Sequence, residues 1–178
     1  MLPQFLKHLS FRTINSSIRA LVSVNISVFE NIVGSDFVLS NSNETSDDDL
    51  ESFNFEFTKV SHGCAQVVIL PKTEDEIRGI IDYCNKEEIK VVPQGGNTGL
   101  VGGGMAMEEN EVIISLKRMN SIKEFDEESG VVVCEPGVVL EGLDMWLRER
   151  GFMSPLDLGS SGSCFVGGNV ATNAGGIR

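Results

Sequence analysis

Residues 94–104 (Gln-Gly-Gly-Asn-Thr-Gly-Leu-Val-Gly-Gly-Gly) are the stretch of this chain best suited to bind a charged ligand. Six of these eleven residues are glycine. Ordering so much glycine costs conformational entropy, so we expect the backbone there to lie close to a partner. Main-chain N–H groups that no side chain shields can bind phosphate. The loop therefore favours a phosphate-bearing cofactor, and the alternative is a flexible surface loop or a set of tight turns.

A second cluster of small residues extends from Pro155 to Gly176 and contains six more glycines, interspersed with Ser, Thr and Asn. Two such loops in one domain are hard to explain as turns alone, which strengthens the cofactor hypothesis. The common nucleotide signatures are absent, because no lysine follows the glycines and no three glycines have the spacing G-x-G-x-x-G. A P-loop NTPase and a dinucleotide-binding Rossmann domain are therefore disfavoured.

A strand–helix–strand unit should position the first cluster. Residues 67–70 form a β-branched run that predicts a buried strand, and residues 90–93 predict another. Between them, Thr73 and Glu76 have the spacing of a capping box, and apolar residues at helical spacing predict a helix over about 74–87. Such a unit normally gives parallel strands, and ligands of open α/β sheets tend to bind where those strands end.

The second cluster should follow a hairpin and a helix. Residues 111–116 predict a strand, and residues 120–126 and 131–135 predict two more strands joined by a tight turn. An apolar stripe predicts a helix over about 138–150, capped by Gly151, with Trp146 in the core. Upstream, residues 40–50 predict a polar linker or the start of a short helix. The alternating Phe53, Phe55 and Phe57 indicate either one face of a strand or a loose apolar arm.

Composition excludes several classes of function. The 178 residues are 41% hydrophobic and 22% charged, as in ordinary globular proteins, and their net charge of −12 disfavours nucleic acid as a partner. The four cysteines form no C-x-x-C pair and only two histidines exist, so metal-ribbon and redox motifs lack their spacing. No apolar run reaches 18 residues, so we expect no membrane span.

The N-terminus differs in kind from the rest. Residues 1–29 contain three basic residues and no acidic one, whereas residues 30–178 carry a balance of −15. A leader that bears Arg and Ser and lacks acids is typical of an organelle transit peptide, and the alternative is a tail of chance composition. We predict a mitochondrial (matrix) transit peptide over residues 1–30, an N-terminal arm or linker over 31–62, and a cofactor-binding domain over 63–178.

The two clusters together resemble the vanillyl-alcohol oxidase/p-cresol methylhydroxylase flavoprotein family. The resemblance lies in Pro93–Gly103, in Pro155–Gly159 and in Gly167–Gly176, and it covers about residues 60–178. It is strongest for the D-2-hydroxy-acid dehydrogenases. The Gly-Gly-Asn-Thr-Gly of the first loop favours the hydroxyglutarate branch over the D-lactate branch, whose members tend to have Gly-Thr-Gly-Thr-Gly. A glycolate dehydrogenase is a further alternative.

The resemblance implies an α+β fold: a PCMH-type FAD-binding domain whose first α/β subdomain contains the strand–helix–strand unit and a small mixed sheet. It also implies that the chain, ending at Arg178, is truncated soon after the second subdomain begins. The residues that it implies for FAD binding are Pro93, Gln94, Gly95, Gly96, Asn97, Thr98, Gly99, Leu100, Gly102, Pro155, Asp157, Gly159, Ser163, Gly168, Asn169, Thr172 and Gly176.

The first-loop residues would wrap the pyrophosphate, Pro155, Asp157, Gly159 and Ser163 would lie along the flavin, and the remainder would complete the pocket. Family members with covalent flavin commonly have a histidine where Asn97 stands, so we expect non-covalent FAD.

The resemblance also implies a reaction: oxidation of (R)-2-hydroxyglutarate to 2-oxoglutarate, with hydride passing to the flavin and electrons leaving through electron-transfer flavoprotein. The catalytic residues and the ligands of a divalent metal such as zinc are expected beyond Arg178, so this chain has no predicted metal site. An inactive product that lacks the substrate domain is the alternative.

Overall fold

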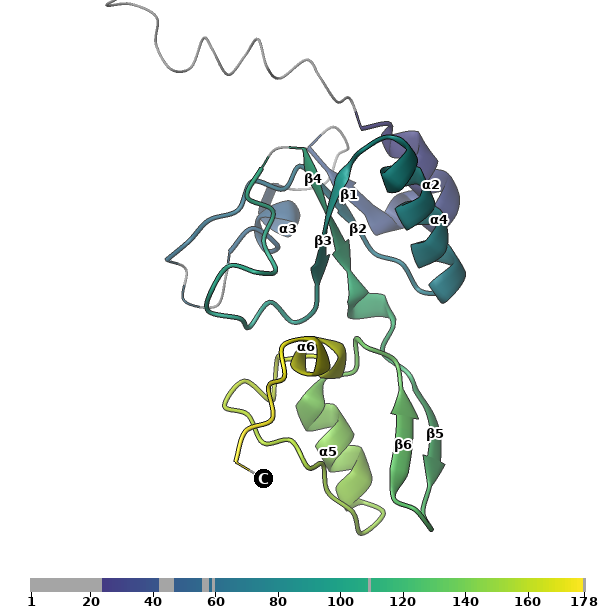
Figure 1. Ribbon diagram of the computed structural model, residues 1–178, viewed down its shortest axis with the longest axis vertical. Helices are drawn as coiled ribbons and strands as arrows, with labels where there is room; N and C mark the ends of the chain where they lie inside the picture. The colour runs from purple at the N-terminus through teal and green to yellow at the C-terminus, as the bar shows by residue number, and fades with distance from the viewer. Residues whose placement is uncertain (1–23, 42–46, 56–57, 59, 109, 178) are drawn as a thin grey trace, which may run out of the picture.

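The computed structural model describes residues 24–41, 47–55, 58, 60–108 and 110–177. They form two lobes that follow one another along the chain (Figure 1). The first lobe carries a four-stranded sheet, and the second carries a two-stranded hairpin packed beside two helices. This arrangement agrees with the predicted α+β class. None of the helices in the described part of the chain is long and apolar enough to cross a membrane.

The first lobe is built around a mixed sheet. Its elements are α2 (Ile26–Val33), η2 (Ser35–Phe37), β1 (Val38–Ser40), α3 (Asp47–Glu51), β2 (Val67–Ile69), α4 (Glu74–Lys86), β3 (Lys90–Gln94) and β4 (Glu111–Ser115). The strand order is β1-β2-β4-β3, with β1 antiparallel to β2 and the other pairs parallel. The predicted strand–helix–strand unit is therefore present, but its connection passes over β4, which lies between β2 and β3.

Both faces of this sheet are covered, as the apolar strands require. Val67 and Ile69 belong to the large core cluster that includes residues of α2 and α4, whereas Val68 belongs to a smaller cluster with Leu50 of α3. Figure 1 shows α2 and α4 on one side of the sheet and α3 on the other. The alternation follows from the two-residue period of a strand. The glycine loop leaves β3 at the end nearer the second lobe.

Helix α4 begins with the predicted Thr73 cap, whose hydroxyl accepts from the N–H of Glu76 at 3.2 Å. The reciprocal half of the capping box differs from prediction. The Glu76 carboxylate accepts from the N–H of Lys72 at 2.6 Å, one residue before the cap. The two bonds together fix the start of the helix at Thr73.

The second lobe follows the predicted pattern. It follows η3 (Leu116–Arg118), which packs on the first lobe through Leu116 and Arg118. Its elements are β5 (Ile122–Asp126), β6 (Val131–Cys134), α5 (Leu140–Arg148) and α6 (Val166–Ala171). β5 and β6 form an antiparallel hairpin, and α5 buries Leu143 and Leu147 against it. Trp146 packs against this core, with its ring edge-on to Phe125 at 5.5 Å. The tryptophan is thus part of the lobe's packing, as predicted.

The N-terminal residues of the described part belong to the first lobe. Helix α2 extends across the predicted boundary at residue 30, and its Phe29 is fully buried with its ring edge-on to Tyr83 at 5.2 Å. β1, which falls in the predicted arm, extends the sheet. Most of the predicted leader lies outside the described residues, as does Phe57, and Phe55 forms a single bridge to His62.

Candidate cofactor-binding site

Gln94, the last residue of β3, closes the first glycine loop. Its side chain is only 3% exposed, and its Nε2 donates to the carbonyl of Gly104 at 2.7 Å and to that of Phe53 at 3.0 Å. The first bond ties the start of the loop to its end, and the second ties the loop to the segment after α3. We predicted Gln94 as a cofactor-binding residue; its amide group is instead directed at main-chain carbonyls.

Asn97 is held in a similar way. Its φ of 51° lies in the left-handed region, which asparagine tolerates better than most residues. Its Nδ2 donates to the carbonyl of Phe55. The side chain is therefore directed at the segment after α3, and it is the backbone of Asn97 that remains available to a ligand.

The backbone of the loop presents a run of free donors. Within the part of the chain that the structure describes, the eight N–H groups from Asn97 to Gly104 donate to no hydrogen bond. A Cβ added at Gly99 or at Gly103 would meet no atom within 4 Å, and Val101 at the loop's tip is 94% exposed. Unshielded consecutive N–H groups of this kind suit the oxygens of a pyrophosphate.

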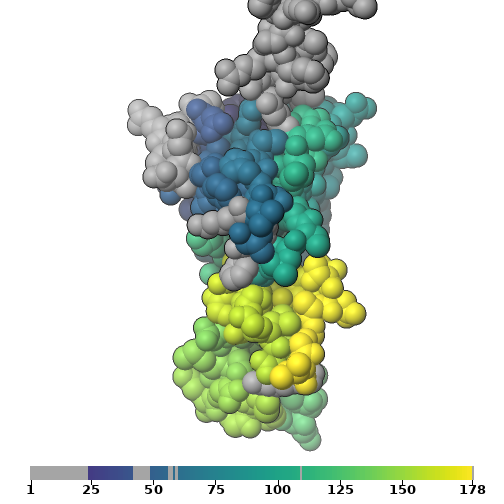
Figure 2. All heavy atoms as spheres, turned by 90° about the vertical axis from the view of Figure 1, so that its left-hand side faces the viewer, coloured from purple at the N-terminus to yellow at the C-terminus, as the bar shows by residue number. Residues whose placement is uncertain are grey.

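The two glycine clusters, some 60 residues apart in sequence, meet in space. A Cβ at Gly96 would lie 2.0 Å from the carbonyl oxygen of Ser163, and a Cβ at Gly95 would lie 3.6 Å from the Phe165 side chain and 3.9 Å from Cα of Gly168. Figure 2 shows the C-terminal segment, in yellow, directly against the first lobe. Gly96 therefore has to be glycine for the lobes to approach this closely, and the contact places both clusters in one site.

The second cluster is folded back on itself. The N–H of Asp157 donates to the carbonyl of Gly175 at 3.1 Å, and Gly176 has a φ of +84°. Two predicted polar side chains bond within the cluster: the Thr172 hydroxyl donates to the Gly168 carbonyl at 2.9 Å, and the buried Asn169 donates to the Cys164 sulfur at 3.5 Å. These two side chains shape the cluster, which leaves backbone groups to face a ligand.

The site carries almost no charge of its own. Residues 94–104 and 155–177 contain no lysine or arginine, and Asp157 is their one acidic residue. An anion bound here depends on main-chain donors, which matches the glycine content. Away from the site, burial raises the pKa of the Cys84 thiol to about 11, and a hydrogen bond from Lys123 lowers the pKa of the Glu135 carboxyl.

Other features of the described residues do not compete with this site. A cavity of about 420 Å³ lies beside α5, between Lys117, Ile122 and Trp146, and it contains none of the predicted cofactor residues. Among the described residues, no group of three His, Cys, Asp or Glu side chains could bind a metal ion.

Sequence reasoning missed one part of the site. The carbonyls of Phe53 and Phe55 receive the amides of Gln94 and Asn97, although these carbonyls precede the loop by some 40 residues. The amide side chains of Gln94 and Asn97 in a glycine-rich loop indicated that the loop bonds to main-chain groups elsewhere. The pattern did not indicate which acceptors they would find.

The fold and the paired loops define a cofactor-binding domain of the flavoprotein type. Residues 65–178 match the family model described as an FAD binding domain. This range is more than half of the chain, and the chain belongs to that family. FAD is therefore its cofactor, and the run of unshielded N–H groups fits the pyrophosphate of that molecule.

Two relatives of known sequence illustrate the relationship. A protein of Schizosaccharomyces pombe provisionally named a mitochondrial D-lactate dehydrogenase is 46% identical over 156 residues, which cover 86% of this chain and 30% of that protein. The mitochondrial D-2-hydroxyglutarate dehydrogenase of Arabidopsis thaliana is 44% identical over 164 residues, which cover 92% of this chain and 28% of the relative. The chain thus spans less than a third of the length of these relatives.

Among solved structures, p-cresol methylhydroxylase with substrate bound aligns with a TM-score of 0.62 at 22% identity, covering 88% of this chain and 28% of that one. This likeness shows the fold. The family resemblance predicted from the two glycine clusters is confirmed, as is the PCMH-type fold.

Proposed function

We propose that this chain is the FAD-holding part of a dehydrogenase that oxidises (R)-2-hydroxyglutarate to 2-oxoglutarate. The observation that carries the proposal is the 44% identity, across 92% of the chain, to a relative named D-2-hydroxyglutarate dehydrogenase. The site supports it, because two glycine clusters from different lobes meet at Gly96 and present free main-chain donors.

The work of this chain is binding and orientation. The N–H groups from Asn97 to Gly104 would hold the pyrophosphate, and the contact of Gly96 with Ser163 would set the distance between the lobes. Pro155, Asp157, Gly159 and Ser163 would lie along the flavin. When bound, the flavin accepts the two electrons that the substrate loses, and the protein supplies position and electrostatics. The electrons would then leave through electron-transfer flavoprotein.

The flavin should be held without a covalent bond. Asn97 stands where covalent members of the family commonly have histidine, and its amide is already engaged with the Phe55 carbonyl. An amide nitrogen is a poor nucleophile, because its lone pair is delocalised into the carbonyl. No other residue from Gly95 to Gly104 has a nucleophilic side chain except the Thr98 hydroxyl.

We also propose that the protein is imported into mitochondria, because the relatives in plants and animals are named mitochondrial and the N-terminus has a leader composition. Burial of Phe29 favours a leader that ends before Val24, since removal of α2 would expose the core of the first lobe. A fluorescent reporter fused after residue 23 should localise to mitochondria, and a diffuse cytosolic signal would refute import.

A second candidate substrate is D-lactate, favoured by the S. pombe relative at 46% identity. Dye-linked oxidation by the complete product of the gene should be measured with D-2-hydroxyglutarate, D-lactate, glycolate and the L-enantiomers. We expect the highest kcat/KM for D-2-hydroxyglutarate. A higher value for D-lactate would establish the second candidate, and no turnover of any 2-hydroxy acid would refute both.

A further inference from the structure

Residues 51–55 lie against the first glycine loop and receive its two amide side chains. The carbonyl of Phe53 accepts from Gln94 at 3.0 Å, and the carbonyl of Phe55 accepts from Asn97. Residues 51–64 precede the range that the family model matches. Two contacts of the cofactor loop are therefore made by residues outside that range.

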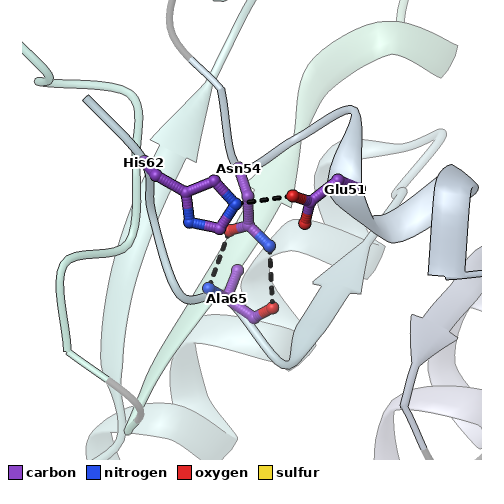
Figure 3. A network of polar contacts seen from close by, with 4 residues as sticks. All are labelled: Glu51, Asn54, His62 and Ala65. Atoms are coloured by element: carbon purple, nitrogen blue, oxygen red, sulfur yellow. Dashed lines mark hydrogen bonds and ion pairs between the residues drawn. The ribbon is translucent and has the colours of Figure 1, made fainter. Parts of the chain in front are cut away.

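The inner end of this segment is held by a buried asparagine. Asn54 is 4% exposed; its Oδ1 accepts from the N–H of Ala65 at 2.8 Å, and its Nδ2 donates to the Ala65 carbonyl at 3.2 Å. Its own carbonyl accepts from the N–H of Gly63 at 2.6 Å. Asn54 thus pairs with Ala65 as a neighbouring strand would (Figure 3). This pairing places the flanking carbonyls of Phe53 and Phe55.

The outer end is held by a side-chain hydrogen bond between His62 and Glu51. Nε2 of His62 lies 2.6 Å from Oε1 of Glu51, and both side chains are about half exposed. The His62 ring is also edge-on to the Phe55 ring at 4.6 Å, and the two residues form a β-bridge. Figure 3 shows the His62 ring directed at Glu51, next to Asn54. The pair therefore restrains Phe55, whose carbonyl is the acceptor for Asn97.

We propose that residues 51–55 position the cofactor loop: Asn54 and the Glu51–His62 pair hold the carbonyls that keep Gln94 and Asn97, and hence the loop's N–H groups, in the shape that binds FAD. The proposal rests on the assignment of FAD to the loop. None of these three residues needs to touch the cofactor. The Glu51–His62 pair acts through Asn97, whose left-handed backbone begins the run of free donors, and Asn54 acts through Gln94 as well.

The test is a double-mutant cycle on the dissociation constant of FAD, measured by flavin fluorescence with the 178-residue chain. Glu51→Ala removes the contact with His62 at a half-exposed helix end, and Asn97→Gly removes the amide while tolerating the positive φ. Each should weaken FAD binding about three- to tenfold, the equivalent of one hydrogen bond. The double variant should bind no more weakly than Asn97→Gly alone, because residues that act through one contact are not additive.

Two further variants separate positioning from general stability. Asp75→Ala removes an exposed ion pair elsewhere, the one between Asp75 and Arg78 at 2.8 Å on α4, and should leave the FAD dissociation constant unchanged. Glu51→Gln keeps an acceptor for His62 and should restore most of the affinity lost in Glu51→Ala. Without FAD, the Tm of Glu51→Ala should match that of Asp75→Ala.

Each outcome decides a different point. If the wild-type chain binds FAD and Glu51→Ala binds it equally well, the positioning role is wrong. The positioning role is also wrong if Glu51→Ala lowers FAD affinity by the same factor in the Asn97→Gly variant as in the wild-type chain. If the wild-type chain itself binds no FAD, the cofactor assignment of the loop fails, and the positioning role fails with it.

Discussion

Gly96→Ala is the substitution that tests the site most directly. The added Cβ would lie 2.0 Å from the Ser163 carbonyl oxygen, 2.9 Å from its carbonyl carbon and 3.0 Å from Cα of Cys164. All three are main-chain atoms, so no side-chain rotation can relieve the clash. The two lobes must move apart or the loop must refold.

The size of the effect follows from this geometry. Overpacking by one methyl group costs about 1–3 kcal/mol, and a clash against backbone belongs at the upper end of that range. For a chain of this length, about 3 kcal/mol corresponds to a fall in Tm of roughly 6–12 °C. FAD affinity should fall by at least about tenfold in addition, because the run of donors and the second cluster would no longer share one site.

The assays are thermal unfolding without FAD and fluorescence titration with FAD. Gly99→Ala is the matched control for stability, because a Cβ there would meet no atom within 4 Å and its Tm should change little. If Gly96→Ala kept the wild-type Tm and the wild-type FAD affinity, the lobes would not meet as the structure places them, and the two-cluster site would be refuted.

Three further predictions concern other groups. Burial raises the pKa of the Cys84 thiol to about 11, so the neutral thiol contributes stability that is fully present below the unfolded pKa of about 8.5. The free energy of unfolding, measured with urea, should therefore decline as pH rises from the unfolded pKa to the folded one. A Cys84→Ala variant whose stability declined equally would contradict this. The pKa of the Glu135 carboxyl is lowered, first by the hydrogen bond from Lys123. The ionised carboxylate contributes at most about 1 kcal/mol to the free energy of unfolding; this contribution is present above the unfolded pKa of about 4.3 and is lost as pH falls through the folded pKa. Glu135→Gln should therefore reduce the loss of stability at acid pH. Acid precipitation of the FAD complex should leave the flavin in the supernatant, and a yellow pellet would show a covalent bond that Asn97 was expected to preclude.

Local patterns in the sequence predicted the local structure well. The Thr73 cap, the hairpin turn before Val131 and the apolar stripe of α5 depend on residues within one or two turns of each other, and all three are present. Even here, the Glu76 carboxylate accepts from the N–H of Lys72 and not from that of Thr73, a detail that the residue types alone did not predict.

Long-range pairing was not predictable in the same way. Nothing in the run of residues 111–115 says that β4 lies between β2 and β3, since each of these strands is apolar on both faces and would accept several neighbours. Similarly, the acid-free N-terminus predicted a leader up to residue 30, whereas the burial of Phe29 depends on α4, some 50 residues later.

The glycine clusters were recognised as a site from composition, but composition did not separate two kinds of glycine. At Gly96, Gly167 and Gly176 a Cβ would lie 2.0, 2.5 and 1.7 Å from another part of the chain, so these glycines permit close packing. At Gly99 and Gly168 a Cβ would meet nothing within 4 Å.

The second kind has no packing reason to be glycine. Neither Gly99 nor Gly168 has a positive φ, so backbone conformation does not require glycine there either. What remains is close approach by a ligand, which a methyl group would obstruct. Alanine at positions of the first kind should therefore lower stability without FAD. Alanine at Gly99 and Gly168 should leave that stability intact and weaken FAD binding. Glycines whose replacement weakens FAD binding without lowering stability therefore mark the path of the cofactor between the lobes.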